Sequence, residues 1–430
     1  MSTTDFSAAA CGTTPLIAAC LAAALLAALV LQLLLTLLFA WVVQRRLSRR
    51  PSLKPPAPAA AVVLCLRGAD PSLPAVLTAL AQQDYPGPWQ LLLLIDSSRD
   101  PAWDVAQEQI ARLQDSGRAR WQAAQLAPLK DPPAAESRKC AALRQAFALL
   151  EASTAVVALV DADAVVRPGW LTALAAACDQ HGIGAVSGNR WYVTSQGSAA
   201  SAVRSIWNGG ALVLMTLLQI PWGGSLAIRR SLIAETGWSD VLATSLCEDT
   251  ALPAPLARAG WRYQFRPELL ALADDDSVAL RPLRRWISRQ LLCARLHHPA
   301  WPLVAVHGLG TWLLLLLALQ ALALTLIAGQ LASAAQLVAA LIAYELGCVG
   351  LLLLIAAIAR RSLEPLGTTL EPTRWATTMQ LLRWLPLAQW VYGLATLRAA
   401  LARQVEWRGV HYAVRGRGVE RLMSEQRSAP

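Results

Sequence analysis

The feature that most constrains this 430-residue chain is an uncharged apolar segment at residues 15–43. It is about 29 residues long and is interrupted only by mild polar residues such as Gln32 and Thr36. A helix of this length crosses the hydrocarbon core of a bilayer with some tilt. A cleaved signal peptide is the alternative, but the run exceeds the usual apolar core of such a peptide and no basic segment precedes it. We therefore expect an N-terminal signal anchor.

Two further apolar runs, at about residues 304–328 and 337–359, are separated by a short uncharged loop. This pattern predicts a transmembrane hairpin rather than a buried core hairpin. The second run contains Glu345, which is costly in hydrocarbon and should face protein or a wet cavity, or be neutral. With 55% hydrophobic and 15% charged residues, the chain fits one soluble domain joined to membrane spans.

Basic residues flank each of the three apolar runs on one side. They are Arg45, Arg46, Arg49, Arg50 and Lys54 after the first, the series at 281–295 before the second, and Arg360 and Arg361 after the third. The positive-inside rule places all these flanks, and the domain at about 55–300, in the cytoplasm. The net charge of +10 fits an anionic membrane surface better than nucleic acid.

The middle of the chain alternates short apolar runs with segments of helical spacing. We expect strands at about 60–66, 91–95, 156–160 and 183–187, with helices at 74–82 and 168–178. Such repetition predicts an α/β domain with a mostly parallel sheet. In such a sheet the ligand crevice lies at the carboxyl ends of the strands, where Asp96 and Asp161 fall.

Asp161 and Asp163 are two residues apart on the loop that follows an expected strand. Two carboxylates so placed can converge on one hard cation, and Mg²⁺ or Mn²⁺ there would bridge to a substrate diphosphate. Acidic pairs also occur at turns for local hydrogen bonding, which is the alternative. The position at a strand end and the later acidic residues favour the metal site.

Glu248 and Asp249 precede an expected helix at 253–259 and supply the candidate general base, Asp249. Transfer of a group from a nucleotide diphosphate to an acceptor hydroxyl would need such a base, because the hydroxyl does not ionise at neutral pH. Capping of the following helix by an acid is the alternative. Arg285 could hold the diphosphate while Trp286 stacks on the acceptor, although the pair also suits a membrane-interface anchor.

Several polar residues are excluded from the site. The acidic triplet at 274–276 is typical of a solvated loop, because adjacent side chains point in different directions. The eight cysteines include no Cys-x-x-Cys pair, which argues against a zinc site or a disulfide framework. The five histidines have no other metal ligands at useful spacing, and we interpret them as interfacial or structural. The segment at 374–403, broken by Pro386, suits a re-entrant or interfacial helix.

With these residues in place, the chain resembles the membrane-bound inverting glycosyltransferases, most closely the ceramide glucosyltransferase-like group. The resemblance lies in the order of several blocks along the chain. These are residues 66–71 (Leu-Arg-Gly-Ala-Asp-Pro), 83–86 (Gln-Asp-Tyr-Pro), 96–102 (Asp-Ser-Ser-Arg-Asp-Pro-Ala), the 161–163 acids, 223–230 (Gly-Gly-Ser-Leu-Ala-Ile-Arg-Arg), 248–249 and 285–286. It resumes at 406–412 (Glu-Trp-Arg-Gly-Val-His-Tyr), which resembles the family's basic tail.

The resemblance implies a GT-A-type nucleotide-diphospho-sugar transferase domain. It implies that Asp96 contacts the nucleoside, that Asp161 and Asp163 hold donor and metal, and that Asp249 is the general base. Lys139 matches a donor-site lysine of the family. The last family motif begins with Gln or Arg three residues before Arg-Trp, whereas Pro282 stands there in this chain.

These observations predict a hexosyltransferase that moves one hexose from a UDP-sugar, with UDP-glucose the first choice, to a ceramide-like or diacylglycerol-like hydroxyl. The stretch at 211–222, too short to span, would help to line the path of the lipid. A processive polysaccharide synthase is the alternative enzyme, and a catalytically silent scaffold that binds sugar nucleotide or lipid is the alternative of another class.

We expect four regions: a signal anchor with its basic flank at 1–50, a cytoplasmic transferase domain at 51–298, a transmembrane hairpin at 299–360, and a re-entrant or interfacial helix with a basic tail at 361–430. The protein would then be integral to the cell's inner (plasma) membrane.

Overall fold

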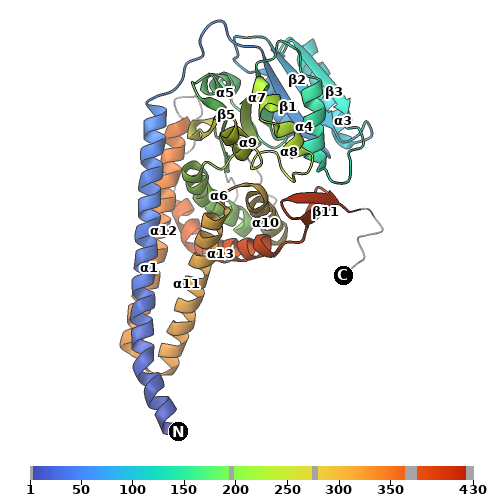
Figure 1. Ribbon diagram of the computed structural model, residues 1–430. Coiled ribbons are helices and arrows are strands. Elements are labelled where there is room, and N and C mark those ends of the chain that lie inside the picture. The colour runs from blue at the N-terminus through green and yellow to red at the C-terminus, as the bar shows by residue number, and fades with distance from the viewer. Residues whose placement is uncertain (1–2, 193–197, 274–278, 364–374, 423–430) are drawn as a thin grey trace.

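The computed structural model describes residues 3–192, 198–273, 279–363 and 375–422. An α/β domain stands at one end of a bundle of long helices, and shorter helices and a small C-terminal sheet lie between them (Figure 1). The acidic triplet at 274–276 lies outside the described residues.

The α/β domain is built on a seven-stranded sheet in the order β3-β2-β1-β4-β7-β5-β8. Its strands are β1 (Ala60–Leu66), β2 (Trp89–Ile95), β3 (Ala123–Pro128), β4 (Val156–Val160), β5 (Ile183–Ser187), β7 (Ser225–Arg229) and β8 (Arg262–Phe265). The first four strands are parallel, whereas β7 runs antiparallel to both β4 and β5. The predicted, mostly parallel sheet is therefore confirmed, with one reversed strand inserted between β4 and β5.

Helices cover both faces of this sheet, which explains why its strands are apolar without alternation. In β1, Val62 and Leu64 pack on one face with α2 (Leu73–Ala81), α3 (Pro101–Asp115) and α5 (Trp170–Cys178). Ala61 and Val63 pack on the other face with α4 (Arg138–Ala148), α7 (Arg230–Glu235), α8 (Trp238–Leu242) and α9 (Pro253–Arg258). Loops at the carboxyl ends of β1, β2 and β4 are left facing the rest of the molecule.

Three long helices form the bundle: α1 (Thr3–Leu47), α11 (Trp301–Ile327) and α12 (Leu331–Leu363). They pack closely; a Cβ atom added to Gly347 of α12 would lie 2.5 Å from a methyl group of Leu29 in α1. Their outer faces expose apolar side chains, and all three are long and apolar enough to cross a membrane. Glu345 faces protein, since its carboxyl is hydrogen-bonded to Gln389.

The basic ends of the bundle lie beside the α/β domain. Arg50 donates a hydrogen bond to the carbonyl of Ser362, 3.3 Å away, which ties the chain after α1 to the end of α12. One turn earlier, the guanidinium of Arg45 lies 5.2 Å from the ring centre of Trp41. Cationic and aromatic side chains thus gather at the end of the apolar bundle, where an aqueous boundary is expected.

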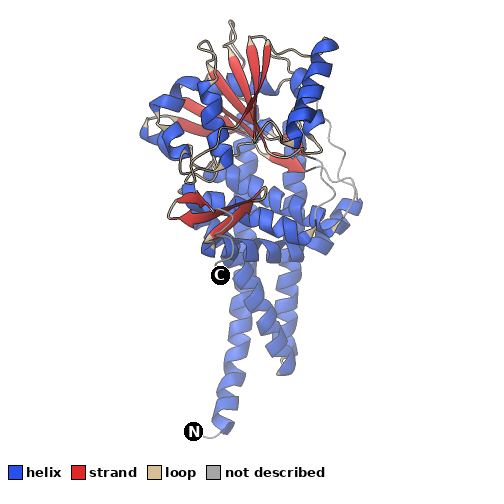
Figure 2. Cartoon of the chain, turned by 90° about the vertical axis from the view of Figure 1, so that its right-hand side faces the viewer, coloured by secondary structure: helices blue, strands red, loops and turns tan. Residues whose placement is uncertain are grey.

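Helices α6 (Ala199–Leu218), α10 (Leu280–His297) and α13 (Trp375–Leu401) form a layer between domain and bundle (Figures 1 and 2). Helix α6 begins twelve residues before the predicted 211–222 stretch and becomes a fourth helix long and apolar enough to span. However, 56% of its most apolar 18-residue segment is buried inside the protein, whereas the corresponding share is 17–22% in the three bundle helices. Helix α13 runs across the axis of the long helices.

The C-terminal tail folds into a three-stranded antiparallel sheet of β10 (Gln404–Trp407), β11 (Val410–Arg415) and β12 (Gly418–Arg421). It is fastened to the α/β domain. Val419 donates its backbone N–H to the carbonyl of Thr244 at 3.1 Å, and the Tyr412 hydroxyl accepts the N–H of Arg138 at 3.2 Å. A two-stranded sheet of β6 (Arg190–Tyr192) and β9 (Ala271–Ala273) lies at the edge of the same region.

Candidate active site

A cleft of about 910 Å³ lies between the strand ends of the α/β domain, helix α10 and the C-terminal sheet. All eight residues that the sequence predicted for the site line this cleft. They are Asp96, Lys139, Asp161, Asp163, Glu248, Asp249, Arg285 and Trp286.

Asp96 directly follows β2, and its side chain is 13% exposed. Its two carboxylate oxygens pair with different arginines: Arg67, which follows β1, and Arg138, in the first turn of α4. The Ser137 hydroxyl caps α4 by accepting the N–H of Cys140, which sets the first turn of that helix at the cleft. Asp96 is therefore held in a fixed orientation by two cations.

Asp161 and Asp163 follow β4 and converge on one cationic atom, Nη2 of Arg190 in β6. This nitrogen lies 3.2 Å from Asp161 Oδ2 and 2.8 Å from Asp163 Oδ1. A second nitrogen, Nη1, donates to Asp163 Oδ2 at 2.8 Å. Burial would lower the pKa of Arg190, but Asp163 and its other partners more than offset this and raise it. The predicted pair of acids thus has the convergent geometry that a cation requires.

Lys139 joins the two groups of acids. Its Nζ lies 2.9 Å from Asp161 Oδ1 and 2.7 Å from Glu248 Oε1, the second contact being an ion pair without hydrogen-bond geometry. Burial would lower the pKa of Lys139, but the two carboxylates raise it well above its usual value. Burial alone would raise the pKa of Asp161, but Lys139 and Arg190 lower it below its usual value.

Glu248 is the deepest acid of the site, with 1% of its surface exposed. Burial raises its pKa to about 7, and Asp249 and Asp161 add to the rise against Lys139. The chain approaches it closely at Gly223, where an added Cβ would lie 1.8 Å from Glu248 Oε1. A glycine is required there because any side chain would displace the carboxylate.

Asp249 is oriented by the backbone. Its Oδ2 accepts the N–H of Gly223 at 2.9 Å, and its Oδ1 accepts the N–H of Thr250 at 2.6 Å. The carboxylates of Asp249 and Glu248 both line the cleft, but Asp249 also lines a second cavity. A carboxylate at the meeting point of two cavities can reach a ligand in either one.

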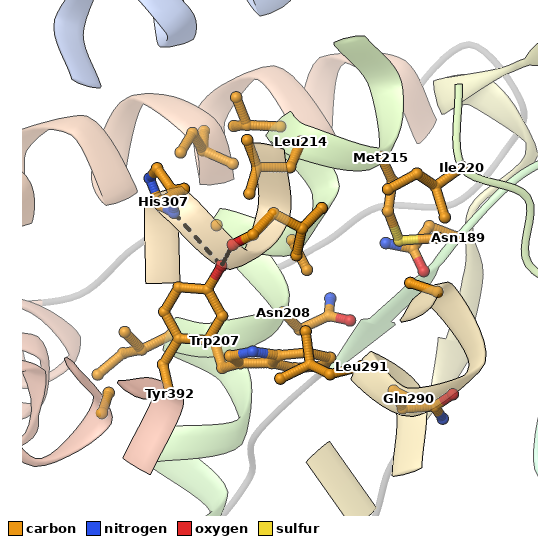
Figure 3. Close-up of a pocket in the computed structure, with 18 of the residues that line it drawn as sticks. Asn189, Trp207, Asn208, Leu214, Met215, Ile220, Gln290, Leu291, His307 and Tyr392 are labelled. Atoms are coloured by element: carbon orange, nitrogen blue, oxygen red, sulfur yellow. Dashed lines mark hydrogen bonds between the residues drawn. The ribbon is translucent and has the colours of Figure 1, made fainter. Parts of the chain in front are cut away.

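The second cavity has a volume of about 230 Å³ and lies among α1, α6, α10, α11, α12 and α13. Figure 3 shows its apolar lining, which includes Leu214, Met215 and Leu291. At one end, His307 lies 2.8 Å from the amide nitrogen of Gln32 and 3.3 Å from the Tyr392 hydroxyl. The predicted stretch at 211–222 does line this cavity, from Ala211 to Trp222.

Helix α10 separates the two cavities and presents the predicted pair to them. Trp286 lines both, and its ring meets Tyr192 and Trp207 edge-on, with centroids 6.3 and 5.4 Å apart. Arg285 lines the cleft only, is 51% exposed, and lies 4.0 Å from Glu406 of the tail sheet. Pro282 also lines the cleft, in the first turn of α10, where proline breaks no helical hydrogen bond.

Sequence reasoning missed several cations of the cleft and one aromatic ring. Arg190 belongs to no motif that the sequence analysis identified, and Arg289 was noted only as part of the basic series at 281–295. The guanidinium of Arg289 lies 4.6 Å from the ring centre of Trp407. Trp407 belongs to the tail segment, which does return to the cleft. For Arg67 a signal existed, since it stands in the block at 66–71.

The comparisons agree with this geometry. The sequence model of Glycosyl transferase family 21 matches residues 16–419. The fold is similar to that of a mannosyltransferase from Pyrobaculum calidifontis, solved in complex with GDP-Man and Mn²⁺, with a TM-score of 0.53, 20% identity, and coverage of 90% of this chain and 99% of that one. No curated protein matches the chain.

A weaker likeness is to glucosyl-3-phosphoglycerate synthase from Mycobacterium tuberculosis, solved with Mn²⁺ and uridine-diphosphate-glucose. Its TM-score is 0.34 at 16% identity, over 54% of this chain and 78% of that one. The family match covers both the α/β domain and the long helices. The chain is thus a GT-A-like glycosyltransferase and belongs to glycosyl transferase family 21.

Proposed function

We propose that this enzyme moves a single hexose from a UDP-sugar, with UDP-glucose the first candidate, to the hydroxyl of a ceramide-like or diacylglycerol-like lipid. One observation carries the proposal: the charged cleft and the apolar cavity meet at the same side chains. Arg190, Trp222, Asp249, Trp286, Gln290 and Cys293 line both. A polar donor and an apolar acceptor can therefore meet at Asp249.

The cleft suits the donor because its cations lie where a diphosphate is needed. Lys139 and Arg190 are paired with Asp161, and their N–H groups are the donors that phosphate oxygens accept. Asp96, fixed by two arginines, is proposed to contact the nucleoside. Arg285, half exposed at the rim, is proposed to contact the diphosphate or the acceptor head group.

Asp161 and Asp163 fit a divalent metal, Mg²⁺ or Mn²⁺, because both carboxylates already converge on the single cationic atom Arg190 Nη2. Among the described residues, no group of three or more His, Cys, Asp or Glu side chains is placed so that it could hold a metal ion by itself. The remaining ligands would thus be diphosphate oxygens and water, as is common for these ions. When bound, the metal would offset charge on the departing diphosphate.

Asp249 is proposed as the general base. It would take the proton of the lipid hydroxyl while that oxygen bonds to the anomeric carbon and the bond to the diphosphate breaks on the opposite face, which inverts the centre. The N–H groups of Gly223 and Thr250 aim the carboxylate. Glu248 is less suited, because it is buried against Lys139 and does not line the apolar cavity.

The acceptor would reach this point from the bilayer, with its chains beside the long helices and its hydroxyl near Trp286. The apolar lining of the cavity supports this route. The basic ends of α1 and α12, tied together by Arg50, would face the cytoplasm and place the transferase domain there.

The first test is transfer of label from radiolabelled UDP-sugars into a membrane lipid extract by the purified protein, with and without EDTA. GDP-mannose belongs in the panel because the similar mannosyltransferase was solved with it. One labelled glycolipid that disappears with EDTA supports the proposal. Label in a polymer would favour a polysaccharide synthase. Label released only as free hexose, the product of hydrolysis, would refute the lipid acceptor.

A further inference from the structure

The side chain of Arg190 occupies the position between Asp161 and Asp163 where a divalent cation would be held. Three of its contacts define that position: two to Asp163 and one to Asp161, all between 2.8 and 3.2 Å. The Arg190 side chain is only 9% exposed, so water competes little for these contacts. A free metal ion would have to displace a bidentate, largely buried ion pair to reach both carboxylates.

The surroundings keep Arg190 in this position. Its Cζ lies 5.0 Å from the ring centre of Trp222 and 5.8 Å from that of Tyr192, within the range of attraction between a cation and a ring. The Asn208 amide donates to its backbone carbonyl at 2.7 Å. Backbone and guanidinium are thus fixed by different neighbours, and the side chain between them can change rotamer without unfolding β6.

A nucleotide diphosphate offers the guanidinium an alternative partner. Arg190 lines the cleft in which the donor is proposed to bind, and its planar fork matches pairs of phosphate oxygens as well as it matches a carboxylate. A donor that binds together with a metal ion provides a new partner for the carboxylates and another for the arginine. The metal satisfies the two carboxylates, and the diphosphate satisfies the arginine.

We propose that Arg190 is a built-in counter-ion that closes the Asp161–Asp163 pair against free divalent cations, so that metal binds only together with a nucleotide diphosphate. This inference rests on the proposed nucleotide-diphosphate donor but not on which sugar or lipid the enzyme uses. Arg190 acts here as a positioning residue: it holds the carboxylates ready and leaves them when the donor complex binds.

The experiment measures binding of Mn²⁺ to the purified full chain without donor or acceptor, by the loss of the electron paramagnetic resonance signal of free Mn²⁺. Wild-type protein should bind Mn²⁺ weakly, and addition of UDP or GDP should tighten binding at least about tenfold. Arg190→Gln should bind Mn²⁺ alone at least about tenfold more tightly than wild type. Arg190→Gln combined with Asp163→Asn should lose that gain.

Arg289→Gln is the matched control, because it removes a cleft cation that lies on Trp407 and acts on Asp161 only through its charge, without an ion-pair contact to either acid. It should change Mn²⁺ affinity much less than Arg190→Gln does. Equal gains in the two variants would mean that general charge, not closure by Arg190, governs the site, and would overturn the inference.

The wild-type protein provides a second readout that needs no variant to fold. Tight, stoichiometric Mn²⁺ binding without nucleotide would contradict the inference even if lipid transfer is confirmed. Conversely, nucleotide-dependent Mn²⁺ binding together with a failure to label any lipid would leave the role of Arg190 standing and refute the proposed acceptor. Failure of one proposal is therefore distinguishable from failure of the other.

Discussion

The cleft and the apolar cavity share a wall, but the polar side chains in them are paired in different ways. In the cleft, charged groups are held by opposite charges: Asp96 by two arginines, and Lys139 by two carboxylates. In the cavity, the polar groups of Gln32, His307 and Tyr392 are uncharged or weakly basic and bond to one another. This difference is what we expect if the cleft takes the polar donor and the cavity takes the proposed apolar acceptor, with only the shared wall in contact with both.

Asp249→Asn should have the largest effect on activity, because this side chain lines both the cleft and the apolar cavity. We expect turnover to fall by about 10²–10⁴-fold, the usual contribution of a general base, with donor binding retained. Lipid transfer and donor binding should be measured on the same preparation. Asp240→Asn, an exposed acid of α8, is the control. Unchanged turnover in Asp249→Asn would exclude this residue as the base.

Glu248→Gln tests the electrostatics of the cleft through stability. The pKa of Glu248 is about 7 in the folded protein and 4.5 in an unstructured chain, so between these values the folded state holds a proton that the unfolded chain has lost. Wild-type stability should therefore fall as pH rises from 4.5 to 7, by on the order of 3 kcal/mol. Glu248→Gln should lack this fall.

The measurement is the thermal midpoint of the EDTA-treated protein at several pH values, compared between variant and wild type. Lys139 stays protonated throughout this window, because its pKa is raised. Glu151→Gln, at an exposed position, should follow the wild-type curve. Parallel curves for Glu248→Gln and wild type would show that Glu248 is already ionised at low pH.

Asp163→Asn tests the predicted donor and metal pair. Loss of one charged contact costs about 1.5–3 kcal/mol, or roughly 10–100-fold in affinity. Donor binding in the presence of Mn²⁺ should weaken by that amount, and EDTA should affect the variant less than it affects wild type. Titration with UDP-glucose measures both. Donor affinity equal to that of wild type would show that Asp163 contacts neither metal nor donor.

Leu214→Trp tests the cavity alone, since Leu214 lines it and does not line the cleft. We expect the KM for the lipid to rise on the order of tenfold while donor binding stays constant, because apolar pockets discriminate by bulk to about this extent. Leu317→Trp is the control, on an exposed face of α11. A rise in KM for both variants would indicate a change in the whole bundle.

The regular part of the domain could be predicted from sequence. Buried strands such as β1 and β4 are continuous apolar runs, and the acids at their ends mark the cleft. Strand β7 gave no sign of its reversed direction, because a short strand with apolar residues at its centre, 226–228, has the same pattern in either orientation. The tail sheet was missed because its strands mix charged and apolar residues, unlike the continuous apolar runs of β1 and β4, and depend on pairing with one another.

The candidate site divides in the same way. Its acids stand out in the sequence, since carboxylates are rarely gathered without a reason. Arg190 does not stand out, because its importance comes from the fold that brings β6 beside the end of β4. The start of α6 was also hidden, since polar residues such as Asn208 interrupt its apolar pattern, and Asn208 is buried because it binds the Arg190 carbonyl.

The short link between α6 and β7 has a practical consequence. Residues 219–224 connect α6, which packs against the apolar bundle, to β7, and within this link the N–H of Gly223 donates a hydrogen bond to Asp249. The orientation of the carboxylate proposed as the general base is thus coupled to how the helices pack in the membrane or detergent around them. We expect activity measured in detergent micelles to vary with the chain length of the detergent, and to become reproducible only when the protein is reconstituted in a bilayer of defined thickness.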